Sequence, residues 1–168
     1  EGAISALAKD YSLEVTPESM TITSETEAMS LGFKGASAEV QPLVQNEEAR
    51  YKNLYPQTDL RVYDKGTGNA GYDLELEPGA SVSDITMQIP GEVIPFVNAK
   101  GDLELIEPGA SAYRHSAPVA WQDIDGEQVP VDAKFALSGH DLGFELGDYD
   151  PAYNPHYTLP YRSFPTLH

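Results

Sequence analysis

The sequence DLELEPGAS at residues 73–81 is nearly repeated as DLELIEPGAS at residues 102–111. Each copy alternates a carboxylate with a leucine and then reaches Pro-Gly. Alternation with a period of two is typical of a β-strand with one buried face and one solvated face. Proline fixes φ and glycine accepts the positive φ that follows, so Pro-Gly predicts a turn. We therefore expect the leucines to be buried and Asp73, Glu75, Asp102 and Glu104 to face solvent.

Further short runs of alternating or apolar residues, separated by turns, extend along the rest of the chain. They are residues 4–7, 12–16, 20–23, 29–33, 60–63, 85–89, 93–97, 118–124, 128–137 and 142–146. The pair Asp125-Gly126 separates 118–124 from 128–137 and predicts a hairpin. These short strands, punctuated by 13 prolines and 14 glycines, predict an all-β fold. We expect an antiparallel β-sandwich or a barrel-like domain with Pro/Gly-rich turns.

The apolar members of these runs form the expected core. We expect it to include Leu60, Val62, Leu74, Leu76, Leu103, Leu105, Val129, Val131, Phe135, Phe144 and Leu146. At 168 residues the chain fits one domain, or at most two small ones, and a chain of this size can bury roughly 68–70% of its unfolded surface. We assign residues 1–150 to an all-β domain and residues 151–168 to a Tyr/Pro-rich C-terminal tail or a final strand.

Composition narrows the set of partners. The chain has 27 acidic and 10 basic residues, a formal net charge of −17, so we expect neither nucleic acid nor anionic membrane surfaces as partners. We expect no membrane insertion, because no segment reaches the roughly 20 apolar residues that span a bilayer. The absence of cysteine excludes disulfides and Cys-ligated zinc. A sequence that starts at Glu1-Gly2-Ala3 is compatible with the mature form of a secreted protein. It is equally compatible with a chain that has been shortened at its N-terminus.

Carboxylates provide the candidate metal ligands. Asp123, Asp125 and Glu127 lie within five residues, and Ca²⁺ takes about six to eight oxygen ligands, several from one loop. The EF-hand pattern is absent, because Gly126 directly follows the second aspartate and no glutamate closes the loop. We expect alternation across the hairpin to send these three side chains to one face, where a shallow calcium site is the candidate. We nevertheless predict no specific metal site and no cofactor. Because neither a Gly-x-Ser-x-Gly motif nor a zinc-type histidine pair is present, we predict that the protein is not an enzyme.

Tyrosines recur every four residues near the C-terminus, at Tyr149, Tyr153, Tyr157 and Tyr161, with prolines between them. The prolines exclude a helix, and in an extended chain this spacing keeps the phenols on one face. Two interpretations stay open. The segment is a last strand on the domain's own core, or it is an arm that docks on a neighbouring subunit or a carbohydrate through Tyr153, Tyr157, Tyr161 and Phe164. For the arm, we expect the prolines to keep the segment from becoming a central strand.

Several segments, taken in order, resemble a known bacterial family. Residues 49–60 (ARYKNLYPQTDL) are similar to its ARYxNxYPGIDL segment, and residues 72–80 (YDLELEPGA) are similar to its YDFxVxPGA segment. Residues 117–126 (APVAWQDIDG) and 142–150 (LGFELGDYD) are similar to its KPVxYQEIDG and VGFxVGxYD segments. The family is the domain of unknown function that precedes SBBP-type β-propeller repeats in secreted bacterial surface proteins.

The resemblance implies an extracellular, all-β, non-catalytic module. We therefore predict a secreted structural or interaction module, such as a self-assembling subunit of an extracellular or cell-surface filament or layer. The expected partner is another copy of the chain, in a homo-oligomer or polymer, because sheets with exposed edges associate by strand addition. The first alternative is an adhesion module that binds carbohydrate or calcium, and the second is a hydrolase.

Overall fold

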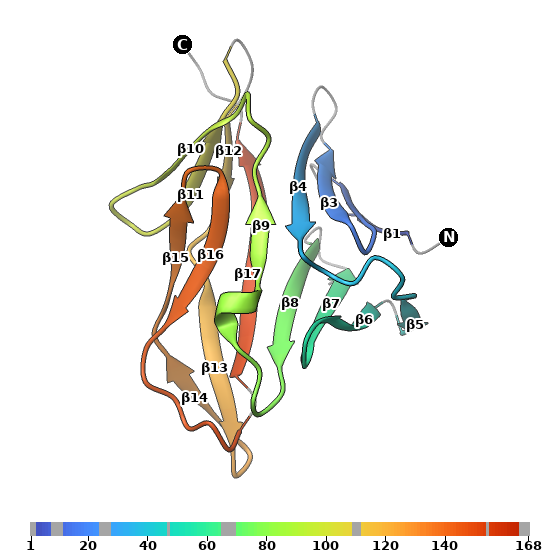
Figure 1. Ribbon diagram of the computed structural model, residues 1–168, viewed down its shortest axis with the longest axis vertical. Helices are drawn as coiled ribbons and strands as arrows, with labels where there is room; N and C mark the ends of the chain where they lie inside the picture. Colours follow the sequence, from blue (N-terminus) through green and yellow to red (C-terminus); the bar gives the residue numbers. More distant parts are fainter. Residues whose placement is uncertain are drawn as a thin grey trace.

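A computed structural model describes residues 3–7, 12–23, 28–46, 48–64, 70–108, 112–153 and 155–164, with the backbone alone for 6–7, 64, 70, 112 and 155–164. The fold is an antiparallel β-sandwich of two open sheets and not a barrel (Figure 1). The all-β prediction is therefore confirmed. In this described part, the helical structure consists of the short 3₁₀ helix η1 (Val82–Asp84). No helix there is long and apolar enough to cross a membrane.

The first sheet has seven strands. In spatial order they are β1 (Ile4–Leu7), β2 (Ser12–Val15), β3 (Ser19–Thr23), β4 (Ala28–Lys34), β9 (Thr86–Gln88), β16 (Asp141–Leu146) and β15 (Ala133–Ser138). The second sheet has ten strands. Its main path is β10 (Ile94–Val97), β11 (Leu103–Ile106), β12 (Ala112–His115), β17 (Pro155–Phe164), β8 (Ala70–Leu76), β7 (Thr58–Asp64), β6 (Glu48–Tyr55) and β5 (Leu43–Gln45). The hairpin of β13 (Val119–Ile124) and β14 (Glu127–Val131) joins this path at β17.

Strand β17 lies in the interior of the second sheet (Figure 1). One of its edges pairs with β8 through residues 156–160. Its other edge pairs with β13 through residues 155–158 and with β12 through residues 161–164. The expectation that prolines keep this segment from a central position is therefore wrong. Pro155 begins the strand, and Pro160, which has no N–H, lies in the interval between the β13 and β12 pairings, so neither proline interrupts a continuous ladder.

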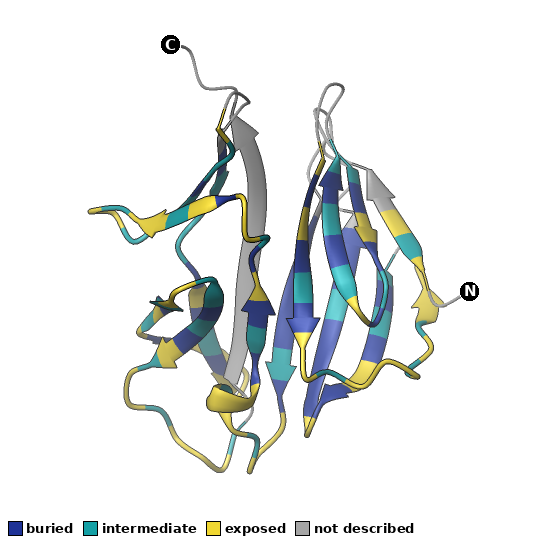
Figure 2. Cartoon of the chain, turned by 45° about the horizontal axis from the view of Figure 1, so that its top comes forward, coloured by how far each residue is buried: buried dark blue, intermediate teal, exposed yellow. Residues whose placement is uncertain are grey.

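The two sheets enclose one hydrophobic core, and buried and exposed positions alternate along the strands (Figure 2). The predicted core residues are buried, with two exceptions. Leu146 is half-buried and packs against the core, and Val129 is 40% exposed. Alternation therefore identified the inner faces of β7, β8, β11, β15 and β16 from the sequence.

The run 128–137, expected as one strand, is divided between the sheets. Strand β14 ends at Val131 and β15 begins at Ala133. Between them, the Asp132 carbonyl accepts a hydrogen bond from the Gly147 N–H (2.7 Å). The β13–β14 hairpin reaches beyond the facing strands at the bottom of Figure 1. Val131 is thus covered by the other sheet while Val129, nearer the turn, is not, and the prediction for Val129 is wrong.

Candidate functional site

The segment 49–60, which carries much of the family resemblance, forms the hairpin of β6 and β7. Its register shifts between Tyr51 and Tyr55, and two non-glycine residues, Asn53 and Gln57, each adopt a φ of 55°. The Asp59 carboxylate accepts hydrogen bonds from the Asn53 N–H (2.9 Å) and from the Arg50 guanidinium (3.1 Å). Asp59 therefore fixes the irregular end of this hairpin.

Two tyrosines of β6 connect the sheets. The Tyr51 hydroxyl donates to the carbonyl oxygen of Val15 in β2 (2.8 Å), and the Tyr55 hydroxyl donates to that of Thr86 in β9 (2.7 Å). Burial raises the pKa of each phenol to about 12, so both stay protonated near neutral pH. A buried tyrosine combines a large apolar ring with a donor that needs a partner. The two tyrosines therefore have a structural role in this motif.

The outer face of β6, β7 and β8 carries an ordered set of charges, which we call the arginine cluster. Its members are Glu48, Arg50, Asp59, Arg61, Tyr63, Asp73 and Glu75. Arg50 binds Asp59 and Glu75. Arg61 lies 3.3 Å from Glu48, 3.6 Å from Asp73 and 3.8 Å from Glu75. The Tyr63 hydroxyl donates to Asp73 (3.0 Å), and the Arg61 guanidinium lies 4.9 Å from the centre of the Tyr63 ring.

The chemistry of the arginine cluster is that of a structural network. The hydrogen bond between the Arg50 guanidinium and the Glu75 carboxylate raises the pKa of Arg50. Asp59, Asp73 and Glu75 are largely covered, and each is paired with a guanidinium, which offsets the loss of hydration. A general acid needs a proton to donate, and a nucleophile needs access to a substrate. These covered, ion-paired carboxylates are poorly placed for either task, and their evident effect is to hold three strands together.

The expected solvent-facing carboxylates are more covered than the alternation predicts. Asp73 is 4% exposed, so its prediction is wrong, and Glu75, Asp102 and Glu104 are half-buried. Long neighbouring side chains such as Arg61 cover Asp73. Asp102 accepts a hydrogen bond from the Ala117 N–H (2.8 Å), and Glu104 accepts one from the Asn98 side chain (2.7 Å). A period of two identifies opposite faces of a strand but does not show what covers the second face.

The calcium candidates lie at the turn between β13 and β14. Asp125 (φ 52°) and Gly126 (φ 83°) form the two-residue turn, so Glu127 pairs with Ile124, and Asp123 pairs with Gln128. Successive residues point to opposite faces, and Asp123 and Glu127 therefore lie on different faces of the hairpin. The expectation that they share a face is wrong. Within the described ranges, no group of three His, Cys, Asp or Glu residues is placed to hold a metal ion.

The tyrosine segment is placed in the second sheet. Its backbone from Pro155 to Phe164 forms β17, and the half-buried Tyr153 precedes it with its carbonyl oxygen bound to the Gln122 side chain (3.1 Å). The side chains of Tyr157, Tyr161 and Phe164 lie outside the described residues. Their contact with a neighbouring subunit or a carbohydrate stays a prediction.

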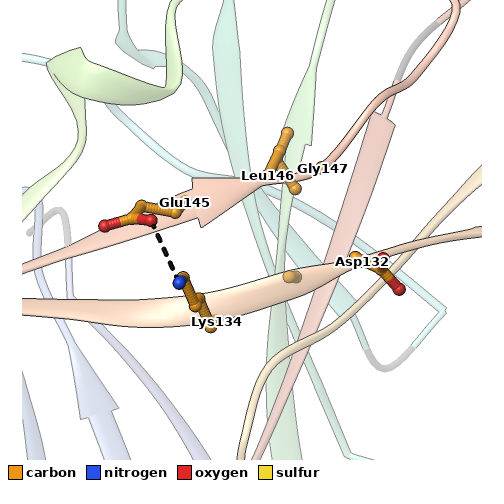
Figure 3. Close-up of a pocket in the computed structure, with 6 residues that line it drawn as sticks. Asp132, Lys134, Glu145, Leu146 and Gly147 are labelled. Atoms are coloured by element: carbon orange, nitrogen blue, oxygen red, sulfur yellow. Dashed lines mark ion pairs between the residues drawn. The ribbon is translucent and has the colours of Figure 1, made fainter.

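An open pocket of about 410 Å³ lies where β15 begins and β16 ends. Asp132, Lys134, Glu145 and Gly147 contribute to its lining, and Figure 3 shows the ion pair between Lys134 and Glu145, which lie 3.5 Å apart. All residues of the lining are exposed or half-buried. An ion pair so exposed contributes about 0–1 kcal/mol. Because no buried polar side chain points to a ligand here, we assign none to this pocket.

One histidine is enclosed by the core. His115 of β12 is 1% exposed. Its Nδ1 lies 3.2 Å from the Ser116 carbonyl oxygen, and its Nε2 lies 2.8 Å from the Tyr72 hydroxyl. A carbonyl oxygen can only accept, so this network assigns the proton to Nδ1 and makes Nε2 the acceptor. Burial lowers the pKa of His115 to about 4, and the ring is neutral near pH 7.

Two of the edge strands of the ten-stranded sheet, β5 and β10, expose apolar side chains. Leu43 and Val44 of β5 are 62% and 66% exposed, and Ile94 and Phe96 of β10 are 54% and 40% exposed. The strands lie on opposite sides of the molecule (Figure 1). Natural edge strands are commonly protected by charged residues or proline. Here Pro95 is the one such residue in either strand. Sequence reasoning missed β5, for which the apolar pair after Pro42 was the available signal.

Most of the chain matches a known family model. A family model, Domain of unknown function (DUF7948), matches residues 26–154. The matched residues contain β4 to β16, and therefore the arginine cluster and both sheet-connecting tyrosines, whereas β1 to β3 and β17 lie outside them. No curated protein and no solved structure matches the chain.

Proposed function

Because the chain belongs to the DUF7948 family, a domain of unknown function, we propose a role from its own surfaces. The protein is a non-catalytic structural or interaction module whose copies associate with one another. It serves as a subunit of a larger assembly, such as a filament or layer.

The observation that carries this proposal is the pair of exposed apolar edges on one sheet. Strands β5 and β10 end the same ten-stranded sheet on opposite sides, and neither contains a charged residue. An edge strand presents unpaired main-chain groups to which another strand can add. Two different edges on one molecule support a head-to-tail contact, and a contact of this kind forms a ring or an open filament.

We further propose that the protein acts outside the cell and is of the type that precedes SBBP-type propeller repeats. The support is the ordered resemblance of residues 49–60, 117–126 and 142–150. Fractionation of the producing cells with an antibody to the chain tests the location. Recovery from the medium or the surface of intact cells is expected, and retention in the cytoplasm would contradict it. The sequence of the full-length gene tests the link to the repeats.

Sedimentation velocity over a range of concentrations tests association. We compare the unmodified chain with the double variant Val44→Lys/Phe96→Lys, which places a charge on each edge. The matched control is Val119→Lys, because Val119 is 57% exposed but lies on β13, which is paired on both sides.

The unmodified chain and the control should form oligomers, and the double variant should sediment as a monomer. A chain that stays monomeric at every concentration would overturn the proposed function. Oligomers of the double variant equal to those of the unmodified chain would instead show that association does not use these edges.

A further inference from the structure

Strand β17 is the connection between three groups of strands. Within the described pairings, β5 to β8 form one group, β10 to β12 a second, and β13 with β14 a third. Among the described strand pairings, these groups are joined into one sheet only through β17, which lies between β8 on one edge and β12 and β13 on the other. Without β17, main-chain groups of β8, β12 and β13 would lose their partners. The remaining strands therefore leave a place in the sheet, between β8 on one side and β12 and β13 on the other, that accommodates one long strand.

This strand comes from outside the residues that the family model matches. The match ends at residue 154, and β17 begins at Pro155. The matched part nevertheless contains all three groups of strands that β17 joins. The residues matched by the family model thus form the strands on either side of β17, while β17 itself comes from the segment that follows them.

The connection into β17 is held by one side chain. Gln122 is buried, and its amide donates to the carbonyl oxygens of Asp150 (2.6 Å) and Tyr153 (3.1 Å) and accepts from the Asp150 N–H (2.9 Å). If residues 147–154 took another path, β17 could make the same main-chain pairings with the strands of another molecule. The pairings of β17 would then be conserved, and the change would be confined to the connecting segment.

We propose that β17 of one copy fills the place between β8 and the β12/β13 edge of a second copy, so that successive copies are joined by exchanged strands. This inference rests on the proposed self-association and identifies the partner as the same chain. The pairing register given above is retained, with Thr158 of one copy opposite Val119 of the next.

Paired single-cysteine variants test the exchange. The chain has no cysteine of its own, so Val119→Cys and Thr158→Cys are prepared as separate chains. Residues directly opposite in antiparallel strands have Cβ atoms about 4.5–5.5 Å apart, close to the separation that a disulfide spans. The two chains are unfolded, mixed, refolded together at high concentration and oxidised. Heterodimer in excess of a matched control, measured by mass spectrometry, indicates that β17 of one chain lies against β13 of the other.

The matched control replaces Val119→Cys with Ser138→Cys, an exposed residue of β15 that does not pair with β17. A second test pair, Arg114→Cys with Arg162→Cys, probes β12 in the same way and serves if the first pair fails to refold. We expect at least a five-fold excess of heterodimer over the control. Heterodimer no greater than the control in the refolded pairs overturns the exchange.

This failure is distinguishable from failure of the proposed function. Oligomers in sedimentation without excess heterodimer would leave the association through β5 and β10 in place and remove the strand exchange alone. Monomers at every concentration would remove both.

Discussion

Tyr51 is a single side chain that both fills the core and connects the two sheets. Its ring is fully buried, and its hydroxyl bonds the Val15 carbonyl of the opposite sheet. Tyr51→Phe keeps the ring but leaves that buried carbonyl without this partner, and an unsatisfied buried group costs about 1–3 kcal/mol. We expect urea unfolding to show a loss of that size.

The control for this change is Tyr149→Phe. Tyr149 is a partly buried tyrosine that packs against the same core, and we expect its substitution to alter the unfolding free energy by less than about 0.5 kcal/mol. If Tyr51→Phe unfolds at the same urea concentration as the unmodified chain, the hydrogen bond between the sheets contributes nothing to stability.

His115 makes the fold sensitive to acid. Its folded pKa is lowered to about 4 from an ordinary value of 6.5, so below pH 6.5 the unfolded chain takes up a proton that the folded chain does not. The contribution of His115 to the free energy of unfolding is therefore fully present above pH 6.5 and is lost as the pH falls toward 4. Each pKa unit corresponds to about 1.4 kcal/mol, and the loss amounts to about 3 kcal/mol.

The measurement compares unfolding free energies of the unmodified chain and His115→Gln between pH 7 and pH 4. Glutamine cannot titrate but can still accept from the Tyr72 hydroxyl. The carboxylates contribute equally to both curves, so the difference between the curves comes from His115. We expect the unfolding free energy of the unmodified chain to fall more steeply with decreasing pH than that of the variant. Parallel curves would show that His115 does not carry the effect.

At the scale of strands, Arg50 connects β6 to the other two strands of the arginine cluster, the adjacent β7 and the next strand β8. It binds Asp59 of β7 and Glu75 of β8, and Arg50→Met would leave both carboxylates without it. A fully buried pair loses roughly 3–5 kcal/mol when one partner is removed. Because the Arg50 side chain is 32% exposed, solvent screening reduces the expected loss to about 1–3 kcal/mol.

The matched control is Lys134→Met, which removes the exposed partner of Glu145. We expect it to change the unfolding free energy by at most about 1 kcal/mol. Equal effects of Arg50→Met and Lys134→Met would show that the arginine cluster adds no more than an ordinary surface pair.

Strand periodicity predicted much of this fold. The alternation in 73–76, 103–105 and 142–146 identified strands and their buried faces, because one-residue shifts would expose every leucine. The division of 128–137 was not predictable in this way. Both halves continue the same alternation, and the chain changes sheets at Asp132, where its carbonyl oxygen accepts a hydrogen bond from the N–H of the distant Gly147.

The candidate sites were less predictable, because they depend on residues distant in sequence. Arg50 and Glu75 meet only when β6, β7 and β8 pair in the observed register. The placement of β17 could not be inferred from its prolines either. Pro160 fits the interior of the sheet because two different strands share that edge of β17.

For the whole molecule, the net charge of −17 makes stability depend on salt, because like charges repel in the compact state. We expect the melting temperature to rise with ionic strength. Calcium chloride and sodium chloride should give the same curve at matched ionic strength, because the described carboxylates form no group that could hold a metal ion.

The control for this prediction is Asp125→Asn, which removes a carboxylate from the β13–β14 turn and should leave the calcium curve in place. A saturable stabilisation at micromolar calcium, growing as RT ln(1 + [L]/Kd) and lost in this variant, would instead establish a specific site at the hairpin.

The position of β17 also sets the order of events during biosynthesis. Its partners β8, β12 and β13 emerge from the ribosome before it, since Pro155–Phe164 follows all of them in the chain. Until that segment is released, the nascent polypeptide holds three incomplete groups of strands with unpaired edges. Such intermediates expose strand edges and apolar surface and are prone to aggregate. A nascent chain of this protein therefore completes its larger sheet only after residues 155–164 have emerged, and slow synthesis of this segment prolongs its dependence on chaperones.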